Sequence, residues 1–165
     1  MVYSIYKMRT LQITRGYSVF LDDDDFERFG KYRWYASICG KRVYASREVS
    51  KTHSYLHREI MKAPKGLFVD HKNHNTLDNR KENLRLCTQV ENNRNRAGAQ
   101  SRSKSGIRGV WWVESRKKWA TSIAVNKRTI PLGRFVKLED AIKARKDAQD
   151  KYYGEFAGGE PLAIS

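Results

Sequence analysis

The chain has 165 residues, which allows one domain or two small ones, and its 39% hydrophobic and 12% aromatic content argues against a disordered protein. Its net charge of +15, spread over both halves, indicates a polyanionic partner, most often nucleic acid, with a solvated basic surface as the alternative. The two cysteines lack ligand spacing and no apolar run approaches membrane-spanning length, so we expect a reduced, cytoplasmic protein with no disulfide framework and no membrane partner.

The first part of the chain, residues 11–60, predicts short strands and turns. The acidic run Asp22–Asp25 allows two interpretations, a cation site or the start of a short helix. We favour the helix, because carboxylates stabilise a helix N-terminus. Two further strands are expected, the second running into a helical turn, at KRVYASREV and HSYLHREIM.

The next segment predicts a strand, a polar loop, a second strand and a helix within about 30 residues. The strands are LFVDH and LRLC. Thr88 and Glu91 have the spacing of a capping box, so the helix should start at Thr88 and carry Asn92 on its first turn.

Residues 97–105 are small and polar and predict a linker. Three strand-like runs follow, then an amphipathic helix that ends at Gly154, and residues 158–165 form a tail. The runs are GIRGVWWV, KWATSIAV and RTIPLGRF, and the helix is LEDAIKARKDAQDKYYG. The whole chain is therefore expected to be α+β, with a small β-rich N-terminal region and a three-stranded antiparallel sheet packed on one helix near the C-terminus.

The segment around Asp70 and His71 carries the residues that phosphodiester hydrolysis needs. His71 can take a proton from water, since an imidazole titrates near neutral pH. Neighbours on a strand point to opposite faces, so Asp70 is expected to do a separate job and bind a metal. Asn92 can add a carbonyl oxygen. Oxygen ligands favour one hard cation, Mg²⁺ or Mn²⁺.

This segment, VDHKNHNTLDNRKENLRLCTQVENN, resembles the ββα-metal motif of HNH endonucleases, especially phage-type homing endonucleases, over about residues 67–96. The resemblance implies that His71 is the general base, that Asp70 and Asn92 bind the metal, and that Asn83 steadies the loop. The third motif position here is Asn, not His, which implies one Mg²⁺-like ion and no zinc. Residues 1–96 would then be the HNH domain.

The last segment, residues 106–157, resembles the plant APETALA/ethylene-response-factor type of DNA-binding domain through IRGV, KWATSI, LGRF, EDAIKA and YYGEFA. The resemblance implies a sheet that lies in the major groove of DNA and a helix behind it. Alternation in KWATSIAV predicts that Trp119, Thr121, Ile123 and Val125 face the helix. Trp111 is expected to point outward. Several sheet arginines of the plant pattern are absent, so its sequence specificity is not carried over.

Together these patterns predict an HNH homing-type endonuclease acting on double-stranded DNA in a bacterial host, encoded by a phage or mobile element. A monomer that nicks and a homodimer that cuts both strands are both compatible with the sequence. Rival hypotheses are a DNA-binding regulator with a degenerate HNH fold and an RNA-directed nuclease. The expected DNA contacts are cationic residues and one indole: Arg80, Arg94, Arg96, Arg108, Trp111, Arg116, Lys117, Lys118, Arg128 and Arg134.

Overall fold

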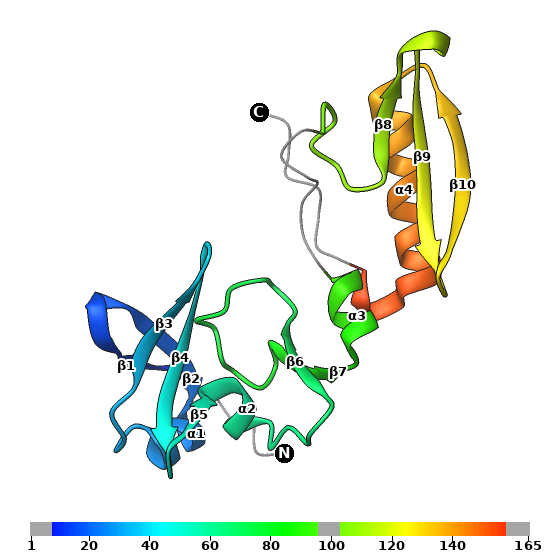
Figure 1. Cartoon of the computed structure of the whole chain (residues 1–165). Coiled ribbons are helices and arrows are strands. Elements are labelled where there is room, and N and C mark those ends of the chain that lie inside the picture. Colours follow the sequence, from blue (N-terminus) through cyan, green and yellow to red (C-terminus); the bar gives the residue numbers. More distant parts are fainter. Residues whose placement is uncertain (1–7, 96–102, 158–165) are drawn as a thin grey trace, which may run out of the picture. The chain divides into compact units, whose positions relative to one another are not determined.

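The computed structural model describes residues 8–95 and 103–157. The chain divides into two compact units between Asn92 and Asn93, and each is described by itself (Figure 1). Arg96, the tail at 158–165 and all but residues 103–105 of the expected linker lie outside the described residues. Within the described ranges, no helix is both long and apolar enough to cross a membrane.

The first unit is built from small antiparallel sheets and short helices, so its mixed α/β character agrees with the sequence. Its sheets are β1-β2, β3-β4-β5 and β6-β7. The elements are β1 (Met8–Gln12), β2 (Ser18–Asp22), α1 (Asp23–Phe29), β3 (Tyr35–Cys39), β4 (Arg42–Val49), β5 (Thr52–Tyr55), α2 (Leu56–Ile60), β6 (Phe68–His71) and β7 (Leu84–Cys87), then α3 (Gln89–Arg94), which runs across the division.

One apolar core holds the first unit together. Trp34, 1% exposed, lies in it and donates its indole N–H to the backbone oxygen of Phe29 at 3.0 Å. Val69 of β6 and Leu84 of β7 belong to the same buried cluster. Burial of one large apolar side chain contributes about 1.5–3 kcal/mol, so this cluster fixes the β6–β7 hairpin on the rest of the unit.

The acidic run forms the predicted helix, α1, but Asp22 does not cap it with its side chain. Instead an Asp22 oxygen accepts a hydrogen bond from the backbone N–H of Lys81 at 2.8 Å. The Lys81 ammonium contacts the carboxylates of Asp24 and Asp25. The cation that meets this acidic run is therefore a lysine of the same chain, and the contact ties α1 to the loop before β7.

The predicted capping box is present at the start of α3. The Glu91 carboxylate accepts from the Thr88 backbone N–H at 2.8 Å, and the Thr88 hydroxyl oxygen accepts from the Glu91 backbone N–H at 3.3 Å. The reciprocal bonds satisfy two backbone donors that the helix leaves unpaired. They set the first residue of α3 directly after β7.

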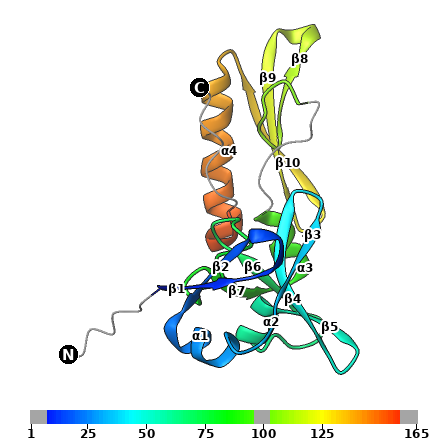
Figure 2. The ribbon, with the colours of Figure 1, turned by 90° about the vertical axis from the view of Figure 1, so that its left-hand side faces the viewer.

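The second unit contains the expected three strands and helix. The antiparallel sheet has the order β10-β9-β8, and α4 packs against it (Figure 2). The elements are β8 (Val110–Val113), β9 (Lys118–Val125), β10 (Arg128–Phe135) and α4 (Leu138–Tyr153).

The face of β9 turned toward α4 follows the predicted alternation in part. Thr121 and Ile123 are buried, whereas Trp119 is half-buried and meets Trp112 edge to face at 5.1 Å. Ala120 is also buried, although it belongs to the opposite face, because its cross-strand neighbours Trp111 and Arg134 flank it. The large side chains of Trp111 and Arg134 therefore cover Ala120 on the outer face of the sheet.

A close approach at Gly109 joins the sheet to α4. Its φ of +82° is a backbone conformation that side-chain-bearing residues rarely adopt, and a Cβ there would lie 2.6 Å from the Ser122 backbone oxygen. That same oxygen accepts a hydrogen bond from the buried guanidinium of Arg145 at 2.8 Å. A side chain at Gly109 would thus disturb both the turn and the packing of Arg145.

Candidate functional site

Asp70 and His71 are consecutive residues of β6, and the β6–β7 hairpin places Arg85 directly opposite Asp70. One Asp70 oxygen accepts two hydrogen bonds from the Arg85 guanidinium, at 2.9 and 2.6 Å. Both residues are buried, with 7% and 8% of their surfaces exposed. A buried carboxylate needs a compensating charge, and here Arg85 supplies it.

His71 lies in a different environment from Asp70, as expected for neighbours on a strand. Its Nε2 lies 3.1 Å from the side-chain oxygen of Asn79, and its ring meets that of His57 edge to face at 5.2 Å. Burial lowers the pKa of His71, an effect that the Asn79 hydrogen bond and the charge of Asp70 oppose. The imidazole is therefore neutral at pH 7 and can act as a proton acceptor.

The loop between β6 and β7 is held against strand β2 of the same unit. The backbone N–H of Phe20 donates to the Leu77 oxygen, and the N–H of Asn79 donates to the Phe20 oxygen, both at 2.9 Å. These two bonds form an isolated parallel bridge. Strand β2, which lies almost 60 residues earlier in the chain, thus fixes the position of Asn79 beside His71.

Asn83 closes this loop from inside. Its side-chain amide donates to the Asp78 backbone oxygen at 2.7 Å, and its side-chain oxygen accepts from the Asn73 backbone N–H at 3.0 Å. Asn83 is buried, and its own backbone oxygen accepts from Lys72 at 2.9 Å. These contacts are those of a residue that holds the loop in shape.

Asn92 is half-buried on α3, the helix that follows β7. Its backbone N–H donates to the Thr88 oxygen at 3.0 Å. The thiol of Cys87 lies near both Asp70 and this first turn. Burial and, second, the charge of Asp70 raise the pKa of Cys87 to about 11, and the Asn92 backbone N–H opposes this rise. That the Asp70 carboxylate and the Asn92 side-chain oxygen bind one hard divalent cation stays a prediction.

The predicted DNA contacts Arg80 and Arg94 have partners within the protein. Arg80 makes two hydrogen bonds of 2.8 Å to Asp78 and contacts Glu82, and the Asp78 carboxylate raises the pKa of the guanidinium. The guanidinium of Arg94 lies 5.3 Å from the ring centre of Tyr153 within the second unit. Their contact with phosphate stays a prediction.

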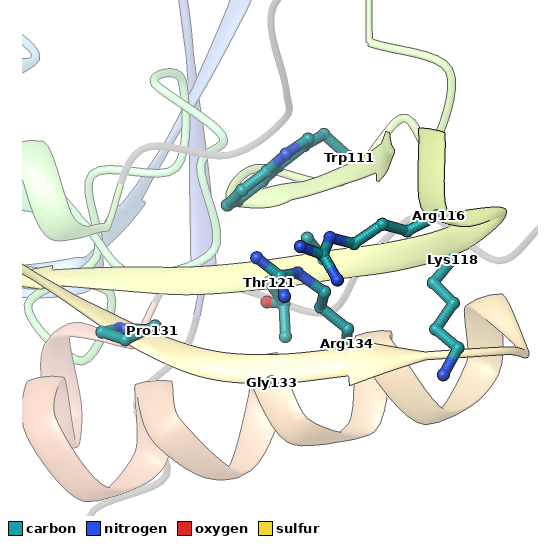
Figure 3. A pocket seen from close by; sticks show the side chains of 8 residues that line it. Trp111, Arg116, Lys118, Thr121, Pro131, Gly133 and Arg134 are labelled. Carbon is teal, nitrogen blue, oxygen red and sulfur yellow. The ribbon is translucent and has the colours of Figure 1, made fainter. Parts of the chain in front are cut away.

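Four of the predicted DNA contacts gather on the face of the three-stranded sheet that turns away from α4 (Figure 3). Register pairs Trp111 with Ala120 and Ala120 with Arg134, so the indole and the guanidinium lie on one face. The indole is 46% exposed. They border an open hollow of about 660 Å³ lined by Trp111, Arg116, Lys118, Ala120, Thr121, Pro131, Gly133 and Arg134.

The other predicted contacts of the second unit do not line this hollow. Arg108 donates to the backbone oxygen of Asn93 at 2.8 Å, and Lys117 forms an ion pair with Glu114. Arg128 is exposed at the start of β10.

Comparison with known proteins bears on the segment that contains the β6–β7 hairpin. Residues 61–94 match the family model of HNH endonucleases. An uncharacterised HNH endonuclease of Acanthamoeba polyphaga mimivirus is 28% identical over 145 residues, which are 87% of this chain and 74% of that protein. Protein 3.8 of Escherichia phage T7 is 35% identical over 60 residues, which are 36% of this chain and 49% of the phage protein. No solved structure matches the chain.

These matches support an HNH endonuclease family domain and, at the level of the family, a nuclease. The matched segment includes all four residues that the HNH resemblance singles out: Asp70, His71, Asn83 and Asn92. The matches to known proteins provide no evidence for an APETALA-type domain. The similarity of residues 106–157 to that family therefore stays a prediction, although the three strands and the helix are present.

The sequence interpretation missed three residues of the site. Arg85 could have been found from strand pairing, because a hairpin that pairs His71 with Leu84 places Arg85 opposite Asp70. Asn79 lies in the polar loop and His57 in the run HSYLHREIM, and neither is among the predicted site residues. Neither carries a local signal for its contact with His71, because both contacts depend on how separate elements pack.

Proposed function

We propose that this protein is a metal-dependent HNH endonuclease of the homing type that hydrolyses phosphodiester bonds in double-stranded DNA. The observation that supports this most is the environment of His71, a neutral buried imidazole held by Asn79 and adjacent in sequence to a buried carboxylate. This pair lies within the segment that matches the HNH family. The fold of the family and the chemistry of the pair thus point to the same reaction.

In this proposal His71 takes the proton from the attacking water. Asp70 and Asn92 would hold one Mg²⁺ or Mn²⁺ ion, and their oxygen donors fit such a cation rather than zinc. When bound, the ion would stabilise charge on the scissile phosphate and on the leaving oxygen. Arg85 orients the Asp70 carboxylate through two hydrogen bonds, and Asn83 braces the loop that carries Asn79.

The second unit would add affinity for DNA. Its outer sheet face presents Trp111 beside Arg116 and Arg134, and the whole chain carries a charge of +15. Cationic side chains on such a face position a protein on phosphates, and small residues such as Ala120 let the sheet approach a groove. We expect this face to set affinity more than sequence preference.

The proposal is tested by incubating supercoiled plasmid with the protein in Mg²⁺, Mn²⁺ or EDTA. Metal-dependent conversion to nicked or linear plasmid would support the nuclease, and the product would distinguish one-strand from two-strand cutting. DNA that shifts on a gel but stays intact with every metal would favour a regulator with a degenerate HNH fold. Duplex RNA as competitor would separate the DNA enzyme from an RNA-directed one.

A further inference from the structure

Two residues outside the predicted site, His57 and Asn79, contact the ring of His71 from separate elements. We propose that they are positioning residues that fix the orientation and the tautomer of the His71 imidazole, so that Nε2 carries the proton and Nδ1 is the nitrogen that accepts one. The inference rests on the proposed function for its catalytic meaning. The positioning itself can be measured in the protein without DNA or metal.

Asn79 is the more constrained of the two. It is 1% exposed, and its backbone is held by β2 through the bond to Phe20. Its side-chain oxygen lies 3.1 Å from Nε2 of His71. An amide oxygen can only accept a hydrogen bond, so in a neutral ring it requires the proton on Nε2 and leaves the lone pair on Nδ1.

The side-chain nitrogen of Asn79 indicates that the contact with His71 does not serve the stability of the fold. Its side-chain nitrogen is buried and has no hydrogen-bond partner among the described residues. A buried donor without a partner destabilises a fold, and leucine would fill the position without that cost. The polar side chain has one described hydrogen-bond partner, the imidazole of His71.

His57 supports the ring from another direction. It is 8% exposed at the start of α2, after Leu56, which is fully buried in the core. Its ring meets His71 at 69° and 5.2 Å and stacks on Tyr55 at 25° and 5.5 Å. The His57 ring is therefore fixed by its own neighbours and blocks rotation of the His71 ring.

Burial lowers the pKa of His57 to about 3, with the charge of His71 as the second cause. His57 is therefore neutral at the pH at which a nuclease works, and it adds no positive charge beside the base. The His57 ring acts on His71 through van der Waals packing of the two rings. A phenylalanine at this position can reproduce that contact, whereas an alanine cannot.

A fixed tautomer matters because a neutral imidazole has a single accepting nitrogen. A ring that can flip or exchange its proton presents the wrong nitrogen part of the time, and general-base catalysis is worth about 10²–10⁴ in rate. Asn79→Ala and His57→Ala should therefore lower the single-turnover cleavage rate constant by about 10-fold or more. Affinity for DNA should change less than about twofold, since neither side chain is exposed.

The experiment combines long-range ¹H–¹⁵N NMR of the histidine rings with single-turnover cleavage. The His71 signal is assigned by its loss in His71→Ala. Wild type should show the Nε2–H tautomer, Asn79→Ala a mixture of tautomers, and Asn79→Asp, which keeps the accepting oxygen, the wild-type pattern. His57→Phe should keep the tautomer and most of the rate, whereas His57→Ala should lose both. Matched controls are Asn75→Ala in the same loop and His53→Ala on β5, both exposed.

Two results would overturn the inference: an Nδ1–H tautomer in the wild type, or an Asn79→Ala protein whose tautomer and rate equal those of the wild type. Equal loss of rate in His57→Phe and His57→Ala would remove His57 from the proposal. If wild type leaves DNA intact while the tautomer still depends on Asn79, the proposed nuclease function fails and the positioning contact stands.

Discussion

The ion pair between Asp70 and Arg85 leads to a quantitative prediction about stability and metal binding. Replacing Arg85 with leucine keeps much of the apolar volume and leaves a buried carboxylate without its cation. Removing one partner of a buried pair costs about 3–5 kcal/mol. The two short hydrogen bonds and exposures below 10% place this pair in that class, so we expect Arg85→Leu to lose about that amount in EDTA.

A divalent ion should recover part of this loss, because the proposed site gives the Asp70 carboxylate another cation. A ligand at 100 times its Kd stabilises the folded state by about 2.7 kcal/mol. The assay is hydrogen exchange of peptides from residues 68–87 over a urea series, which follows the first unit alone. It is run in EDTA and in Mn²⁺, with Arg128→Leu as the exposed control.

If Arg85→Leu lowers the free energy of unfolding in EDTA by less than about 1 kcal/mol, the Asp70–Arg85 pair does not behave as a buried ion pair. Exposed ion pairs contribute no more than that. Stabilisation by Mn²⁺ that is absent in Arg85→Leu would count against Asp70 as a metal ligand.

Three further predictions concern the two units separately. Gly109→Ala should destabilise the second unit by about 1–3 kcal/mol in thermal unfolding, whereas Gly106→Ala, with open space around it, should cost only about 1 kcal/mol. Arg134→Ala should weaken DNA binding and reduce the slope of log Kd against log salt by about 0.9, the value for one phosphate contact; an unchanged slope would contradict that contact. Because the folded pKa of His57, about 3, lies below that of the unfolded chain, its neutral form stabilises the fold above pH 6.5 and this is lost as the pH falls toward 3. His57→Phe should flatten that acid dependence by up to about 1.4 kcal/mol per pH unit in urea unfolding, and an unaltered slope would contradict the burial of a neutral His57.

The local elements of this protein could be predicted because each depends on neighbours in sequence. The capping box at Thr88 and Glu91 joins residues three apart, and the alternation in β9 places Thr121 and Ile123 toward α4. Trp119 deviates because it meets Trp112 near the end of the sheet rather than the core.

The contacts that complete the site could not be predicted in this way. Phe20 holds the loop of Asn79 from a strand almost 60 residues away, and Lys81 pairs with an acidic run at a similar separation. No periodicity encodes such pairings, because they arise from how separate elements share one core. Motif spacing singles out Asn83, but its partners in the loop, the Asn73 backbone N–H and the Asp78 backbone oxygen, are set by the fold.

The most direct test of the central claim is single-turnover cleavage of plasmid DNA by wild type and His71→Ala at saturating enzyme, in Mg²⁺, in Mn²⁺ and in EDTA. Binding of the same DNA is measured in parallel by gel shift in EDTA. The proposal predicts metal-dependent cleavage that falls by at least about 100-fold in His71→Ala while binding stays within about twofold. Cleavage that persists in EDTA or in His71→Ala, or an equal loss of cleavage and binding, would contradict the role of His71 as the base.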